Sequence, residues 1–152
     1  MTYDLMTTRK IKKTLTIKKP SQIHEFLKRY AKSKQEQFLV ITLNGNHDII
    51  SIHIATIGLV NKTIAHVREV FIHAILDNAS SIIIAHNHPS GNTEPSPEDI
   101  QITIHFKEAA DLLGFNFLDH IIISKNDYYS FRQHQECYKE LFNDPDLFHN
   151  VK

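Results

Sequence analysis

The stretch IIIAHNHPSGNTEPSPEDI, residues 82–100, predicts a strand, a tight loop and the start of a helix in immediate succession. Its first residues are apolar on both faces of an extended segment, as in a strand buried inside a sheet. Pro89 and Gly91 then turn the chain sharply without adding bulk. Ser96 suits a helix N-cap and Pro97 the first helical position. A strand end and a helix start should therefore lie side by side around one loop.

Three side chains in this stretch are of the types that bind metal ions. His86 and His88 are two residues apart at the end of the strand, so both imidazoles can point the same way. Asp99, in the first helical turn, can face back towards the loop as a third ligand. Two neutral imidazoles and one carboxylate leave the fourth position of a tetrahedral Zn²⁺ open for water, as in catalytic zinc sites. Such water loses a proton near neutral pH, and a nearby glutamate is then needed as the general base.

The four-residue spacing is far more specific than the histidine pair alone. With 11 histidines in 152 residues, chance alone gives roughly 0.8 His-x-His pairs. Requiring Ser96 and Asp99 at their places lowers that expectation to about 0.003. A structural alternative exists, because Ser-x-x-Asp at a helix start is also a capping box. Capping and catalysis are compatible at the same residues.

Periodic patterns predict further elements on both sides of this stretch. Residues 21–36 predict a helix with Ser21 as N-cap, and residues 37–58 predict two strands joined at Asn44-Gly45-Asn46. The remaining expected elements are a helix within 61–80, a helix from Pro97 to Leu113 ended by Gly114, a hairpin of 117–124 with 128–131, and a helical tail from Gln133 to about Phe142. The order predicts a mixed sheet flanked by helices, of α/β or α+β class, and neither a doubly wound fold nor an eight-stranded barrel.

Composition limits the kind of protein this can be. The length of 152 residues with 41% apolar content suits one domain with a real core. No apolar run approaches a membrane span or a secretory signal, so we expect a cytoplasmic protein without a membrane partner. The single cysteine, Cys137, cannot form an internal disulfide. It also excludes zinc sites that need two or more thiolates.

Basic residues are concentrated in the first nineteen positions. This segment has six basic residues against one acidic residue, a net charge of +5, whereas residues 20–152 carry −5. We expect residues 1–19 to be a basic extension and residues 20–152 to form the single domain. Clustered lysines can contact a nucleic-acid backbone. A solvated edge strand explains the same alternating pattern, and no aromatic residues are interleaved to stack on bases.

The motif carries a resemblance to a known family. His86-Asn-His88 followed by Ser96-x-x-Asp99 resembles the JAMM (MPN+) metalloprotease signature, and HNHPSGNTEPSPEDI with LLGFNFLDHIIIS is similar to the RadC family of bacterial JAMM-domain proteins. The resemblance covers roughly residues 20–134. It implies a three-layer, cytidine-deaminase-like α/β fold, with His86, His88 and Asp99 as zinc ligands. It also implies that Ser96 helps to stabilise the tetrahedral intermediate.

The family's remaining catalytic residue is a glutamate at the junction of the first helix and first strand. Glu36, just before the strand QFLVITL, has that position, and Glu69, inside the helix of HVREVF, is the alternative. We expect Glu36 to activate the water and Glu69 to serve packing, capping or a salt bridge. Val67 stands where related sequences often have proline. Full-length members carry a glycine-using helix-hairpin-helix region, and the first 44 residues here contain no glycine, so we expect this region to be missing.

These features together favour a Zn²⁺-dependent metallopeptidase-like hydrolase that cleaves an amide or isopeptide bond in a protein or peptide. The two histidines and carboxylate suit iron or manganese less well. One alternative is a non-catalytic, metal-stabilised binding module that uses the basic extension on nucleic acid, and another is a metal-dependent phosphodiesterase. His120, next to Asp119, is expected to form a structural hydrogen bond near the site rather than to be a fourth ligand. A nucleobase deaminase is excluded because its zinc site needs Cys-x-x-Cys.

Overall fold

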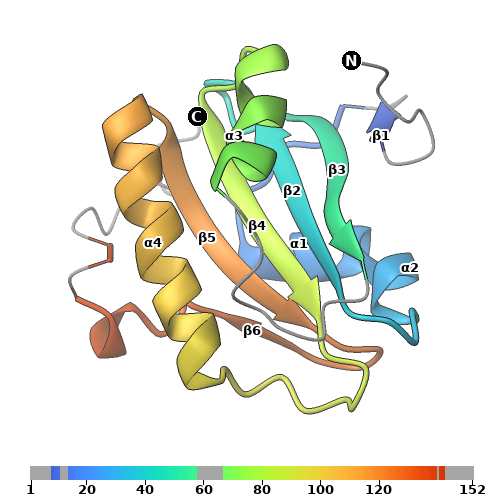
Figure 1. The fold of residues 1–152 in the computed structure, drawn as a ribbon. Helices are drawn as coiled ribbons and strands as arrows, with labels where there is room; N and C mark the ends of the chain where they lie inside the picture. Colours follow the sequence, from blue (N-terminus) through green and yellow to red (C-terminus); the bar gives the residue numbers. More distant parts are fainter. Residues whose placement is uncertain (1–7, 11–13, 58–66, 140, 143–152) are drawn as a thin grey trace.

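The computed structural model describes residues 8–10, 14–57, 67–139 and 141–142 (Figure 1). Its elements in chain order are β1 (Thr8–Lys10), α1 (Pro20–Phe26), α2 (Lys28–Ala31), β2 (Gln37–Leu43), β3 (Ile49–Ile57), α3 (Val67–Leu76), β4 (Ser81–Asn87), α4 (Pro97–Leu113), β5 (Asn116–Ile123), β6 (Tyr128–Ser130) and the 3-10 helix η2 (Gln135–Cys137).

The described strands form one mixed sheet in the order β1-β3-β2-β4-β5-β6. β4 and β5 are parallel and are connected through α4, whereas the other neighbouring strands are antiparallel. A parallel pair needs a crossover connection, and the helix after the loop supplies it. The chain is therefore an α/β domain, which confirms the predicted mixed sheet flanked by helices.

Both faces of the sheet are covered. Along β2, Leu39 and Ile41 belong to a core shared with Ile23 and Leu27 of the α1–α2 region. Phe38 and Val40 point the other way, into a core shared with α3 and α4. Figure 1 shows α1 and α2 on one side of the sheet and α3 and α4 on the other. Because successive side chains of a strand alternate between faces, β2 and β4 are buried on both sides and position their ends rigidly.

The predicted helix over residues 21–36 is shorter than expected. Its N-cap is Lys19 rather than Ser21, because Pro20 occupies the first helical position. The helical region is interrupted at Leu27 and ends at Ala31. Beyond it, backbone carbonyl groups accept hydrogen bonds from a side chain of β4 instead of from a further helical turn.

The predicted helical tail is wrong. Within residues 133–142, the described part contains only the three-residue η2. Leu141 and Phe142 are buried against the α3–α4 face individually, so the tail packs through turns rather than as a helix. The helix predicted within 61–80 is present as α3, and residues 58–66 lie outside the described part. The predicted helix from Pro97 to Leu113 matches α4, which ends at Gly114 in a left-handed conformation.

Part of the basic segment joins the sheet. Thr8–Lys10 form an edge strand that pairs with β3, and Ile17 is fully buried in the core. Thr16 also forms an isolated bridge with Asp48. Among the described helices, none combines the length and the apolar character that a membrane crossing requires.

His73 on α3 should make stability depend on pH. Burial, together with the neighbouring His53 ring 4.1 Å away, lowers the pKa of His73 from 6.5 to about 4. As pH falls from 6.5 to about 4, position 73 gains a proton in the unfolded chain but not in the folded chain, so the contribution of His73 to the free energy of unfolding should decrease. Urea unfolding across this range, with a chelator present, measures it. Compared with the wild type, His73→Gln should lose less stability as pH falls through this range, whereas the exposed His105→Gln should follow the wild type; an unchanged slope in His73→Gln would contradict this assignment.

Candidate metal site

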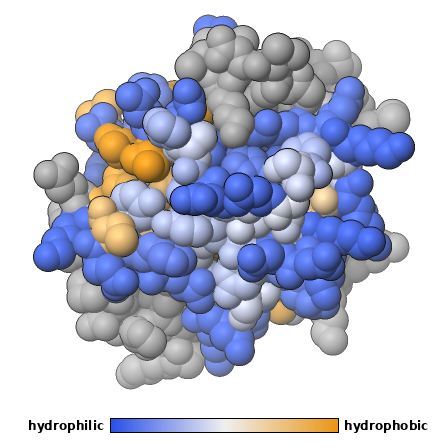
Figure 2. Space-filling model, turned by 90° about the horizontal axis from the view of Figure 1, so that it is seen from below, coloured by the Kyte–Doolittle hydropathy of each residue, from blue (hydrophilic) through white to orange (hydrophobic). Residues whose placement is uncertain are grey.

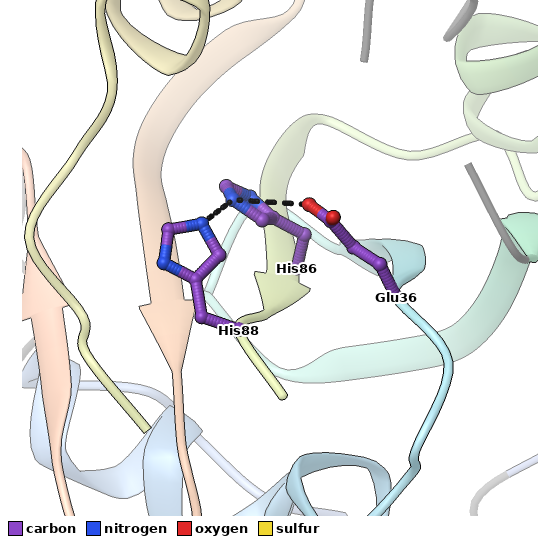
Figure 3. A group of neighbouring side chains, drawn as sticks. All are labelled: Glu36, His86 and His88. Carbon is purple, nitrogen blue, oxygen red and sulfur yellow. Dashed lines mark hydrogen bonds and ion pairs between the residues drawn. The ribbon is translucent and has the colours of Figure 1, made fainter. Parts of the chain in front are cut away.

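The candidate site lies where β4 leaves the sheet. His86 is buried on the face of β4 that α4 covers, opposite Phe38 of β2 in the strand register and stacked with it at 6.1 Å between ring centres. His88 follows in the loop, and Glu36 precedes β2. Figure 3 shows the side chains of Glu36, His86 and His88 converging from these segments. One ligand atom from each lies within 4.8 Å of the others, so these residues could hold a metal ion.

Asp99 completes a tighter set of donor atoms. The Nε2 atoms of His86 and His88 are 3.0 Å apart. The two carboxylate oxygens of Asp99 lie 3.2 Å from His86 Nε2 and 3.4 Å from His88 Nε2. For metal–ligand bonds near 2.0 Å, the edge of a coordination tetrahedron is about 3.3 Å. The structure thus brings together the three residues predicted as ligands, at separations that one cation would fit.

Hydrogen bonds on the far side of each imidazole fix which nitrogen faces the site. His88 Nδ1 lies 2.7 Å from the carbonyl oxygen of Asn92, which can only accept, so Nδ1 carries the proton. His86 Nδ1 lies 2.8 Å from Nε2 of His120, and His120 Nδ1 lies 2.5 Å from the hydroxyl of Thr103. That hydroxyl donates to the backbone carbonyl of Asp99 at 2.6 Å, so it accepts from His120.

Because His120 donates through Nδ1, its Nε2 accepts a hydrogen bond, and His86 therefore carries its proton on Nδ1. The Nε2 lone pairs of both histidines and the oxygens of Asp99 then face one another in a buried space. Facing lone pairs repel unless a cation or proton lies between them. The donor set therefore fits a metal ion, and the polar atoms behind the ligands are the supports that metal-binding histidines usually have.

The local electrostatics favour the ligand forms of these groups. Burial lowers the pKa of His86, which keeps the imidazole neutral, although Asp99 opposes this effect. Burial alone would raise the pKa of Asp99, but the His86 and His88 imidazoles outweigh it and lower that pKa well below its usual range. Metal ligands must be neutral histidine and ionised carboxylate. The pKa shifts of His86 and Asp99 favour these forms.

Glu36 lies at the edge of this set. Its carboxylate oxygen is 3.9 Å from His86 Nε2, farther than the Asp99 oxygens, and its side chain is 17% exposed. Glu69 lies in the first turn of α3, where a carboxylate interacts favourably with the helix dipole. Within the described residues, Glu69 forms no hydrogen bond or ion pair with the site histidines.

Ser96 forms a reciprocal capping box with Asp99. Its hydroxyl accepts from the Asp99 backbone N–H at 3.2 Å, and its own N–H donates to the Asp99 carboxylate at 2.8 Å. Ser96 thereby orients a candidate ligand, while its role towards a reacting substrate stays a prediction. His120 contacts His86 as a hydrogen-bonding neighbour, as predicted. Asp119 points elsewhere and accepts from Ser130 and the backbone of Arg132.

Asn87, which the sequence patterns did not single out, holds the Glu36 segment in place. It is fully buried and lies between the two histidines, facing the other side of the sheet. Its side-chain oxygen accepts from the backbone N–H of Gln37 at 2.7 Å. Its amide donates to the carbonyls of Ser33 and Gln35 at 3.3 and 3.0 Å. A polar residue inside an otherwise apolar buried strand was the available signal for such a contact.

Asn87→Ala should destabilise the fold by about 2 kcal/mol, because buried backbone groups around Glu36 lose their partners. Urea unfolding measures the change. Asn126→Ala, in the exposed β5–β6 turn, serves as control and should change the free energy of unfolding by less than about 0.5 kcal/mol. Equal stability of the Asn87→Ala and wild-type proteins would contradict the structural importance of these three hydrogen bonds.

Thr103→Val should weaken metal binding without changing any ligand. The substitution keeps the side-chain size but removes the hydroxyl that accepts from His120 and donates to Asp99. Loss of an outer hydrogen-bond partner typically costs about 10–100-fold in metal affinity. Competition with a chromophoric chelator for Zn²⁺ measures the affinity, and Thr103→Ser, which restores a hydroxyl, is the control. Identical affinities for the valine and serine variants would rule out this support.

The fold and this cluster together define an α/β domain with a candidate metal site at one end of its central strands. The model of the RadC-like JAB domain family matches residues 17–136. The chain belongs to this family, which confirms the resemblance seen in the sequence and implies the MPN fold.

Its curated relatives are named UPF0758 proteins. The chain is 51% identical over 98 residues to one from Methanospirillum hungatei, an alignment that covers 64% of this chain and 44% of the relative. It is 47% identical over 120 residues to one from Alkaliphilus metalliredigens, covering 77% and 51%. It is 46% identical over 99 residues to one from Picosynechococcus, covering 65% and 41%. The chain thus spans about half the length of the relatives it matches.

Proposed function

We propose that the protein is a Zn²⁺-dependent hydrolase of the JAMM type that cleaves an amide or isopeptide bond in a protein or peptide. The observation that carries this proposal is the buried convergence of His86, His88 and Asp99, with Glu36 at the rim. In this assignment the first three residues are the metal ligands. The domain has the three-layer, cytidine-deaminase-like arrangement that the family suggests.

Distances to the two histidines distinguish the role of Asp99 from that of Glu36. The Asp99 oxygens lie 3.2 and 3.4 Å from the Nε2 atoms of His86 and His88, whereas the nearest Glu36 oxygen is 3.9 Å from His86 Nε2. We therefore assign Asp99 as the third ligand, although Glu36 lies near enough to the histidines to coordinate an ion with them. When bound, the metal would supply a Lewis acid and lower the pKa of a coordinated water.

Glu36 and Ser96 would act on the reacting groups. Glu36 takes a proton from the attacking water and returns it to the leaving amine, which is the work of a general acid–base. The Ser96 hydroxyl, at the start of α4, donates to the oxygen on which negative charge develops. Asn87 supports the first of these roles, because its hydrogen bonds hold the backbone on both sides of Glu36.

The surface around the site suits a polar substrate. β4 and β5 end at the lower side of the molecule in Figure 1, and Figure 2 views the protein from that side. The described residues there are mostly hydrophilic, with hydrophobic residues gathered towards the left of the view. His88 and Glu36, with side chains 11% and 17% exposed, are within reach of solvent. An extended peptide is the partner proposed for this surface.

The test uses purified protein loaded with Zn²⁺ and a pool of peptides and lysine-linked isopeptides, with products identified by mass spectrometry. The proposal predicts new termini that appear with time, disappear with a chelator and return when Zn²⁺ is restored. Cleavage that persists unchanged in the chelator would exclude a metal-dependent mechanism. Metal binding without cleavage of any peptide or isopeptide in the pool would count against the hydrolase assignment.

A further inference from the structure

We propose that a lysine-rich pocket beside the candidate metal site binds an acidic side chain of the peptide substrate. This inference rests on the proposed function, since it assigns the chemical class of the substrate near the scissile bond. The pocket has a volume of about 660 Å³. Its lining residues are Ala31, Lys32, Ser33, Lys34, Pro89 and Lys125.

The pocket is built from the same segments that carry the candidate catalytic groups. Pro89 directly follows His88, and Lys34 lies two residues before Glu36. The backbone N–H of His88 donates to the carbonyl of Ile123 at 2.9 Å, which holds the turn carrying Lys125 against the histidine loop. A group bound in the pocket would therefore be a short distance along an extended peptide from the reacting bond.

Asn87 connects the segment that contains Ser33 and Glu36 to the end of β4, from which the histidine loop begins. Its amide donates to the carbonyls of Ser33, in the pocket lining, and Gln35, next to Glu36. Pocket and candidate site are thus parts of one hydrogen-bonded unit. A substrate anchored in the pocket would be positioned relative to Glu36 with little loss of orientation, which is how remote contacts assist catalysis.

The charged residues that line the pocket are all positive. Three of its lining residues are lysines and none is acidic. In the described part of the chain these lysines form no ion pairs, in contrast to Lys28 and Lys107, which pair with Glu25 and Asp111. The whole chain has a formal net charge of zero, so the positive charge here is local. Like charges gathered in one hollow raise the local concentration of an oppositely charged ligand.

The lining favours an acidic peptide over a nucleic acid. Single-stranded nucleic acids are usually held by aromatic side chains that stack on the bases, in addition to positive charge. The pocket has no aromatic lining residue. Lysine ammonium groups suit carboxylates as point charges and require no fixed planar geometry. An aspartate or glutamate a few residues from the cleaved bond fits these properties.

The experiment measures binding, so that it is independent of turnover. A fluorescein-labelled peptide with three consecutive glutamates, and its glutamine counterpart, are titrated with the full chain and followed by anisotropy at low and moderate salt. The triple variant Lys32→Gln/Lys34→Gln/Lys125→Gln is compared with Lys18→Gln/Lys19→Gln/Lys139→Gln. The control changes three exposed lysines outside the pocket and alters the net charge equally.

The expected result is that the pocket variant loses affinity for the glutamate peptide by about tenfold, as three exposed ion pairs would allow. The control variant should stay within about twofold, and the glutamine peptide should bind weakly to every variant. Equal losses in the two variants would overturn the proposal, because only net charge would then matter. A labelled oligonucleotide of equal charge that binds more tightly than the peptide and depends on the same lysines would overturn the peptide assignment.

Binding in the pocket and hydrolysis at the metal site are measured separately, so either can be present without the other. Pocket-dependent binding of the glutamate peptide without cleavage of any peptide would retain the pocket and remove the hydrolase. The opposite result would be metal-dependent cleavage without a preference for acidic residues near the new termini, together with no effect of the pocket variant on binding. It would support the hydrolase assignment and contradict the role of the pocket.

Discussion

His88→Ala is expected to reduce the affinity for Zn²⁺ by much more than about 100-fold. Loss of an outer hydrogen-bond partner alone can cost roughly 100-fold, and this substitution removes a proposed ligand. The substitution removes one of three proposed ligands, whose Nε2 atom lies 3.0 Å from that of His86. His88 is the preferred position for this test because its side chain is partly exposed and lies in a loop, so the fold should tolerate alanine. Competition against a chromophoric chelator gives the affinity.

A histidine outside the site provides the control for this loss. His105 is exposed on α4, and His105→Ala should bind Zn²⁺ as tightly as the wild type. The 11 histidines of the chain make adventitious zinc binding a real competitor in such a titration. Equal weakening by both substitutions would mean that the bound metal is spread over surface histidines, and the site would lose its support.

Glu36→Gln is expected to lower the rate of peptide hydrolysis by about 10²–10⁴-fold, the usual contribution of a positioned general base. Glutamine keeps the size and polarity of the side chain but cannot accept the proton. The affinity for Zn²⁺ should change by no more than a few-fold, because the Glu36 oxygen lies farther from His86 than the Asp99 oxygen does. Rate and affinity are measured on the same preparation, with a substrate found in the peptide pool.

The pair of readouts separates the two roles that Glu36 could have. If Glu36→Gln loses its metal together with its activity, Glu36 is a ligand and the assignment of Asp99 must be revised. Glu69→Gln is the matched control, because Glu69 was the alternative in the sequence and lies on α3. Loss of hydrolysis in Glu69→Gln with full activity in Glu36→Gln would reverse the assignment of the general base.

The strand, loop and helix around His86 could be predicted from sequence because their signals are local. An all-apolar strand, turn residues and an N-cap followed by proline each determine the conformation of only a few neighbouring residues. The histidine spacing then places both imidazoles on one side, and Asp99 in the first helical turn brings its carboxylate back towards them. The position of Glu36 before β2 was likewise a local feature.

The hydrogen bonds that hold the site residues in place join segments far apart in the sequence, so no local sequence pattern predicts them. Asn87 contacts a segment about 50 residues earlier in the chain, and Thr103 reaches His120 across the interface of α4 and β5. The helical tail was overestimated because Leu141 and Phe142, which follow η2, pack on the core individually, and such contacts do not require helical periodicity. The first helix was predicted too long for a related reason, since Asn87 takes the backbone groups that a longer helix would have used.

X-ray diffraction from crystals grown with Zn²⁺, with anomalous data collected on both sides of the zinc absorption edge, would show whether His86, His88 and Asp99 bind one metal ion. We expect one strong anomalous peak about 2.0–2.2 Å from His86 Nε2, His88 Nε2 and an Asp99 oxygen, with Glu36 outside the ligand shell. A peak elsewhere, or well-ordered His86, His88 and Asp99 side chains with no peak between them, would contradict the account.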